Sequence, residues 1–177
     1  IKNAKSEYSS AGGGAGIGGG NGGSATVTIS GGTIGSQDNN DDGAFGRGGG
    51  AGIGGGNGGS ATVTISGGTV HASTDANEGG AGIGSGKGST GATKIDITKD
   101  ALVYAHGSGG AAIGSGESST GETTINIHDT NTGKGVKSAF AYGGAGIGSG
   151  RYAKGKTYIT IDKAFVSTLE TSDPYTN

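Results

Sequence analysis

The sequence predicts an all-β protein that folds as a right-handed parallel β-helix, a solenoid of about five coils with three short strands in each coil. The phrase Gly-Gly-Ala-(Gly/Ala)-Ile-Gly occurs five times, and its isoleucines are 36, 30, 30 and 34 residues apart. An alternating run of polar and apolar residues follows every copy. Self-similarity at this period is typical of stacked coils, and parallel crossovers are right-handed.

Glycine dominates the composition: the chain has 46 glycines among 177 residues, and only 29% of it is hydrophobic. So few apolar residues cannot fill a thick core between two layers. They suit a narrow solenoid, because each coil contributes only a handful of inward side chains. The regular spacing argues against a flexible linker, and collagen is excluded because glycine does not fall at every third position.

The first predicted strand of each coil is the glycine-rich phrase itself. Its small residues let neighbouring backbones approach closely, and its isoleucine fills the interior. The five isoleucines are Ile17, Ile53, Ile83, Ile113 and Ile147.

The second predicted strand alternates polar residues with valine or isoleucine, which is the pattern of a half-buried strand. Five such strands, one repeat apart, would stack in parallel at about 4.8 Å and form columns of valine and isoleucine. An antiparallel meander is the alternative, and it would instead join like strands within a hairpin. The runs are residues 26–29, 62–65, 94–97, 124–127 and 158–161.

The third predicted strand is shorter and more variable. If its small or apolar residues point inward, one outward column contains Gly35, His71, Tyr104, Phe140 and Phe165. His106 and Tyr142 then stand beside that column.

We interpret residues 1–177 as one β-helix domain with repeats near 14–49, 50–79, 80–109, 110–143 and 144–177. Neither end resembles an amphipathic cap, although the terminal coils of a solenoid expose unpaired edges and core. We therefore expect either a fragment of a longer protein or end-to-end self-association.

Charge and residue types exclude several function classes. The formal net charge of −2 indicates no nucleic-acid partner, and no apolar run approaches the length of a membrane span. The chain has no cysteine, which rules out a disulfide framework and a thiolate zinc site.

The phrases Gly-Gly-Ala-Gly-Ile-Gly-Gly-Gly and Ala-Thr-Val-Thr-Ile-Ser-Gly-Gly-Thr-Val resemble the glycine-rich β-helical repeats of large secreted and wall-attached bacterial surface proteins. The resemblance covers nearly everything from Gly13 to Val166. It implies an extracellular or cell-surface location and a role as a stalk, an adhesin or a carbohydrate-recognition module. It implies no particular functional residue.

The outward ladder of aromatic rings is the candidate carbohydrate site. Sugars present apolar C–H faces, so a strip of rings spaced by coil stacking can hold an extended polysaccharide or surface glycan. The alternative is that the rings only stabilise neighbouring strands through cross-strand pairs. The candidate residues are His71, Tyr104, His106, Phe140, Tyr142 and Phe165.

Two acidic loops form a candidate calcium site. Asp38, Asn40 and Asp42, followed by glycine, match the opening of a calcium-binding loop, although the glutamate expected at its twelfth position is missing. Asp75 and Glu78 lie one coil later, where they can complete the oxygen shell. The alternative is an ordinary solvated turn.

The residues thus favour a non-enzymatic extracellular binding or adhesion module of a bacterial surface protein that recognises glycans. The first alternative is a purely structural solenoid or stalk that self-associates. The second is a polysaccharide-degrading enzyme, for which Asp41, Asp42, His71 and His106 are the only raw material.

Overall fold

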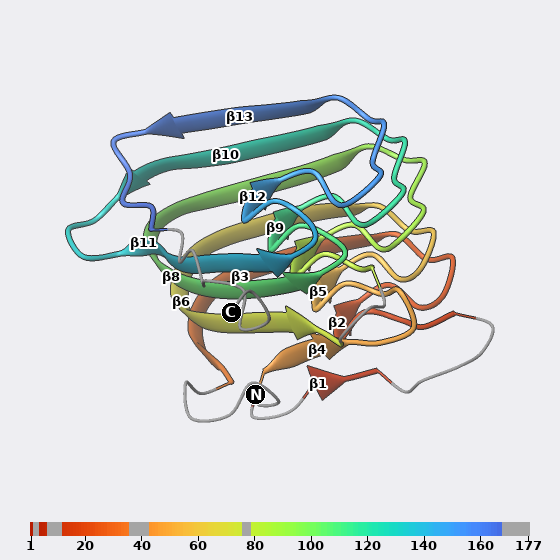
Figure 1. Ribbon diagram of the computed structural model, residues 1–177. Helices are drawn as coiled ribbons and strands as arrows, with labels where there is room; N and C mark the ends of the chain where they lie inside the picture. The colour runs from red at the N-terminus through yellow and green to blue at the C-terminus, as the bar shows by residue number, and fades with distance from the viewer. Residues whose placement is uncertain (2–3, 7–11, 36–42, 76–78, 168–177) are drawn as a thin grey trace, which may run out of the picture.

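The computed structural model shows a parallel β-solenoid, and it describes residues 1, 4–6, 12–35, 43–75 and 79–167. Figure 1 shows the coils stacked from the N-terminal coil at the bottom to β13 at the top. The described chain makes about four turns, is all-β and contains no helix. Accordingly, no described segment is a helix long and apolar enough to cross a bilayer.

One side of every coil is a two-residue Ile-Gly strand from the repeated phrase. These strands pair in parallel, with isoleucine on isoleucine and glycine on glycine. They form a five-stranded sheet of β2 (Ile17–Gly18), β5 (Ile53–Gly54), β7 (Ile83–Gly84), β9 (Ile113–Gly114) and β12 (Ile147–Gly148).

The other two sides of the coil belong to a single larger sheet. The sequence predicts separate second and third strands, but in most coils the structure joins them into one bent strand. At the corner Gly67 pairs with Asp100 and Gly68 with Ala101, so the ladder continues around the bend. The strands are β1 (Ala4–Lys5), β3 (Ala25–Ile34), β4 (Ala44–Gly46), β6 (Ala61–Thr74), β8 (Thr93–Ser108), β10 (Thr123–Thr130), β11 (Gly135–Tyr142) and β13 (Thr157–Asp162).

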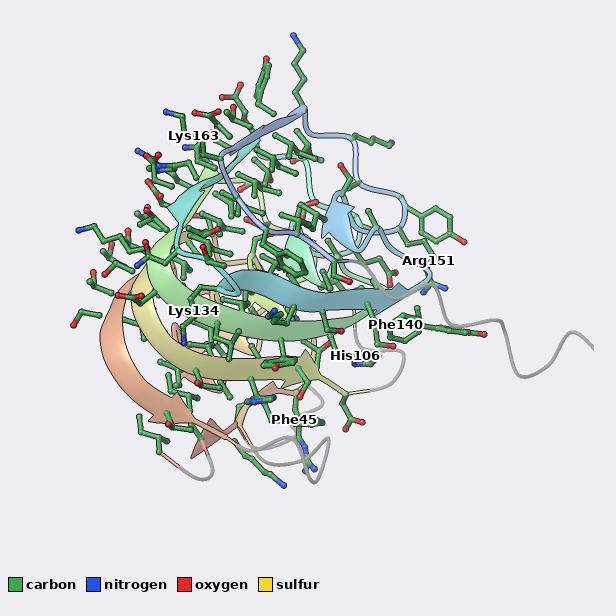
Figure 2. All side chains as sticks on the ribbon, turned by 90° about the vertical axis from the view of Figure 1, so that its left-hand side faces the viewer. Phe45, His106, Lys134, Phe140, Arg151 and Lys163 are labelled. Atoms are coloured by element: carbon green, nitrogen blue, oxygen red, sulfur yellow. The ribbon has the colours of Figure 1, made fainter. Side chains whose placement is uncertain are left out.

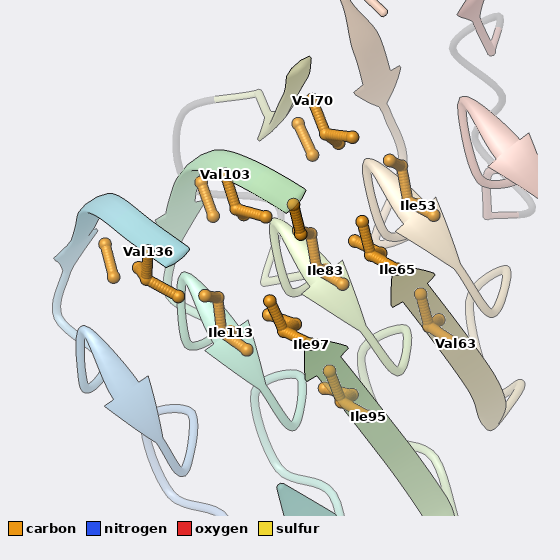
Figure 3. Packing of buried hydrophobic residues seen from close by; sticks show 14 of the residues in the cluster. Ile53, Val63, Ile65, Val70, Ile83, Ile95, Ile97, Val103, Ile113 and Val136 are labelled. Atoms are coloured by element: carbon orange, nitrogen blue, oxygen red, sulfur yellow. The ribbon is translucent and has the colours of Figure 1, made fainter. Parts of the chain in front are cut away.

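The core is a set of columns of identical or nearly identical apolar residues. Figure 3 shows two of them, one of isoleucines from the short strands and one that runs from Val70 through Val103 to Val136. A third column runs from Ile29 through Ile65 and Ile97 to Ile127. The predicted axial columns are therefore confirmed. Full burial of each of these side chains stabilises the fold by about 1.5–3 kcal/mol.

Glycine lets the coils approach at the corner after each Ile-Gly strand. A Cβ atom on Gly86 would lie 1.9 Å from the carbonyl oxygen of Gly56 in the coil below. The following coils repeat the contact, because Gly116 meets the carbonyl of Gly86. No side chain fits there, so the glycine two residues after the repeated phrase is a packing requirement from Gly56 upward.

Buried serine hydroxyls fix the spacing of the later coils at the same corner. The Ser85 Oγ accepts a hydrogen bond of 2.9 Å from the amide of Gly116, and the Ser115 Oγ accepts one of 3.1 Å from the amide of Gly150. Each hydroxyl thus satisfies a buried donor that belongs to the next coil.

We expect the Gly86→Ala substitution to lower the free energy of unfolding by about 3 kcal/mol, because the new methyl group overlaps the backbone of the coil below. Chemical denaturation followed by circular dichroism measures the change. Gly20→Ala is the matched control, since a Cβ atom there meets nothing within 4 Å. That control should change stability by no more than about 0.5 kcal/mol; equal losses for the two variants would contradict the close approach.

Candidate functional site

Most of the sequence-predicted rings lie on one outward side of the large sheet, which we call the ring face. It is formed by β4, the second half of β6 and β8, and β11. Figure 2 shows Phe45, His106 and Phe140 one above another on this face, with Arg151 beyond them at the corner. The side chains alternate along each strand, so every second residue of the face points outward.

The sequence predicts Phe140 in one column with His71 and Tyr104, and this placement is wrong. In one column His71 lies opposite Tyr104, and Tyr104 lies opposite Ser138. In the other His106 lies opposite Phe140. A bulge between Val136 and Ser138 adds one residue to β11, so Phe140 lies opposite the outward His106 and not opposite Gly107.

Within each column the rings lie face to face along the solenoid axis. The ring centroids of His71 and Tyr104 are 4.5 Å apart at 3°, and those of His106 and Phe140 are 5.2 Å apart at 22°. Burial lowers the pKa of both histidines below its ordinary value, so both are neutral at pH 7. The two rings of each stacked pair face each other, and all four residues are half-buried.

Free ring surface appears in the upper part of the stack. The Tyr142 residue, opposite Ser108, is 53% exposed, and Phe165 is 45% exposed. Phe165 lies outside both columns, next to β11, where the Lys137 Nζ lies 4.3 Å from its ring centroid. The candidate residues thus divide into stacked rings in the middle coils and exposed rings above them.

Sequence reasoning missed Phe45, which closes the lower end of the ring face. It lies opposite Ser73, in the same column as His106, and is only 7% exposed. The side chains of Lys5 and Arg47 lie 5.8 Å and 5.4 Å from its ring centroid. An insertion precedes β4, so the repeat pattern does not align Phe45 with the other rings. The pairing of β4 with β6 places it on this face.

Of the candidate calcium ligands, the structure describes Asp75 alone. Asp38, Asn40, Asp42 and Glu78 lie outside the described residues. The Asp75 Oδ2 is 3.8 Å from the Arg47 Nε, so this carboxylate lies beside a guanidinium. Within the described ranges no group of three acidic or histidine side chains has the arrangement of a metal site, and calcium stays a prediction.

A charged ladder of Lys87, Glu117 and Arg151 lies at the corner beside the ring face. Its middle member, Glu117, is only 6% exposed. Its Oε1 lies 3.3 Å from the Lys87 Nζ, and its Oε2 accepts a 2.9 Å hydrogen bond from the Arg151 Nη2. Burial works to raise the pKa of Glu117, but the two cations outweigh it and lower that pKa below its ordinary value.

A second polar cluster lies on the opposite side of the bend. The His128 Nδ1 lies 3.1 Å from the Asp129 Oδ2, and its Nε2 lies 3.1 Å from the Asp96 Oδ1 in the coil below. The hydrogen bond with Asp129 and the charge of Asp96 raise the pKa of His128 above its ordinary value. As the pH falls, His128 becomes protonated, and its imidazolium links two coils through Asp96 and Asp129.

Comparison with known proteins finds no matching family model, curated protein or solved structure. The arguments about function therefore depend on the geometry of this chain.

We expect Glu117→Gln to destabilise the protein by about 2 kcal/mol at pH 7, because the hydrogen bonds to two cations lose their charge. The pKa of Glu117 is lower in the folded than in the unfolded protein, so its contribution is present above the ordinary glutamate pKa. The difference from wild type should shrink as the pH falls below about 4. Thermal melts across this range measure it, with the exposed Glu122→Gln as control; a difference independent of pH would contradict the ion pairs.

The His128→Gln variant should show the opposite pH dependence. Since the pKa of His128 is higher in the folded protein, its contribution is complete below about pH 6.5 and is lost as the pH rises through the folded pKa. We expect the melting temperatures of wild type and variant to differ most near pH 6 and to converge at alkaline pH. Melting temperatures that diverge with rising pH would show that the ring is not held by the two aspartates.

Proposed function

We propose that the protein is a non-enzymatic, extracellular binding module of a bacterial cell-surface protein, and that it recognises a polysaccharide through the upper part of the ring face. One observation carries this proposal. The chain has only six tyrosines and three phenylalanines, yet Tyr142 and Phe165 expose about half of their surface above the stacked rings. Exposed rings beside a rigid sheet are a suitable platform for a ligand.

The division of the rings refines where a sugar would bind. The inner faces of the stacked pairs are covered by each other, so the middle coils offer mainly ring edges and the Tyr104 hydroxyl. Tyr142 has no ring opposite it, because its strand partner below is Ser108. Its open surface suits the apolar face of a sugar, and the Arg151 guanidinium at the neighbouring corner adds hydrogen-bond donors.

Rigid positioning supports the same proposal. Phe140, two residues before Tyr142, is fixed by its stack on His106, and Arg151 is fixed by Glu117. Side chains that are ordered before binding lose little conformational entropy when a ligand arrives.

The structural alternative, a solenoid that serves as a stalk, is favoured by the ring stacks themselves. Two rings whose faces lie against each other stabilise adjacent strands by about 0.2–1 kcal/mol per pair without any ligand. On this reading the middle coils use His71 and Tyr104 only to hold the sheet together.

We expect Tyr142→Ala to weaken polysaccharide binding at least tenfold, because it removes the most open ring of the face. Affinity electrophoresis in gels that contain different polysaccharides, followed by calorimetry on any hit, measures the loss. Tyr158→Ala is the matched control, since Tyr158 is similarly exposed on another side of the coil and should leave binding unchanged.

Tyr104→Ala separates the two functions. If the protein is only a stalk, wild type binds no polysaccharide and this substitution lowers the melting temperature alone. If wild type binds and both Tyr142→Ala and Tyr158→Ala bind equally well, the ligand lies elsewhere and the ring face is not the site.

A further inference from the structure

The two ends of the solenoid carry strand edges that no described residue pairs. At the top, β13 pairs only with β10, and β12 pairs only with β9. At the bottom, residues 25–32 of β3 pair only with β6, and β2 pairs only with β5. Figure 1 shows β13 above all other strands. Unpaired edges of this kind are templates for another chain.

The top edge also exposes core side chains. Ile159 and Ile161 are 46% and 50% exposed, although Ile125 and Ile127, directly below them, are completely buried. The segment from Tyr158 to Ile161 contains no charge, proline or bulge. Such features normally protect an edge against association, and they are missing here.

Hydrogen-bonding groups at the top point away from the protein. The Thr123 amide donates to the Lys156 carbonyl in the coil above, and Thr123 is the register partner of Thr157. Because the parallel ladder alternates, the amides of Thr157, Ile159 and Ile161 point upward, away from β10.

The bottom edge offers the complementary groups. The Ala25 amide donates to the Ser60 carbonyl in the coil above, so the Thr26 carbonyl and the Thr28 amide point downward, away from β6. All strands of the stack run parallel, so a copy translated along the axis brings its β3 onto β13 in the same direction. The next coil would then continue the pattern of every internal one.

The side chains of the two edges match column by column. In that register Val27 lies over Ile159 and Ile29 over Ile161, which extends two core columns. On the outward side Thr26 lies over Tyr158 and Thr28 over Thr160, so no like charges meet along these strands. Apolar and β-branched cross-strand pairs of this kind stabilise a sheet.

We propose that copies of this chain stack head to tail, β13 of one against β3 of the next. On the third side of the coil, residues 164–167 of the lower copy and Ala4–Lys5 of the upper copy each supply part of one strand level. Among the described residues, these two segments overlap around Ile1, which pairs with Thr33 and Gly35 and is 68% exposed. Ile1 must therefore move away from Thr33 and Gly35 when the copies join.

A head-to-tail contact uses two different surfaces, so each added copy exposes a new top and a new bottom. Assembly is therefore open-ended and grows with protein concentration. This inference does not depend on the proposed glycan binding, because it rests on the strand edges and core columns of β3 and β13.

Sedimentation velocity of the full chain from micromolar to millimolar concentration tests the proposal. Ile161→Lys blocks the top, and Val27→Lys blocks the bottom, because each buries a charge in the joined core. Thr160→Lys is the matched control, since it adds the same charge on the outward side of β13. If Val27→Lys fails to fold by circular dichroism, Thr26→Pro blocks the same edge by removing an amide that no strand uses.

Wild type and Thr160→Lys should form oligomers that lengthen with concentration, and each blocked variant alone should remain monomeric. An equimolar mixture of the two blocked variants should form dimers and nothing larger, because one open top meets one open bottom. The proposal is overturned if wild type stays monomeric at millimolar concentration. It is also overturned if Val27→Lys dimerises by itself, which would indicate a symmetric contact between tops.

Discussion

The fold depends on one constraint: each residue of a coil must lie directly above its equivalent in the coil below, at the spacing of a β-ladder. Backbone hydrogen bonds between coils set that spacing, and corner glycines such as Gly86 permit it where carbonyls such as that of Gly56 leave no room for a Cβ atom. Like residues then meet like residues. The isoleucine and valine columns are a consequence of this register, as are the ring stacks and the polar ladders.

The same register has a disadvantage, because it also stacks equal charges and polar atoms. The chain avoids repulsion by changing the residue from coil to coil. Glu117 stands between Lys87 and Arg151, and His128 reaches down to Asp96. Buried Ser85 and Ser115 replace glycines of the earlier coils and satisfy amides of the coils above. These contacts lock neighbouring coils in one register, which apolar columns alone specify weakly.

A solenoid of this kind has two kinds of surface, and they suit different partners. Its sides are regular, rigid and chemically varied, so a polymer can lie along them where rings such as Tyr142 are open. Its ends are unfinished sheet and core, so they suit a surface with the same strand direction and register. Another copy of the chain has both the same strand direction and the same register. Lateral binding at Tyr142 uses a side of the coil, whereas axial stacking uses its ends.

The sequence by itself determined the repeat, the parallel stacking and the inward columns, because periodicity reports directly which side chains share an environment. It also placed most of the rings on one side of the coil. Only the tertiary structure decided which rings meet, because a one-residue bulge before Ser138 shifts Phe140 onto His106. It alone revealed Phe45, hidden behind an insertion, and the burial of Glu117 between two cations. These features depend on register across long sequence separations, and local patterns carry no information about a single added residue.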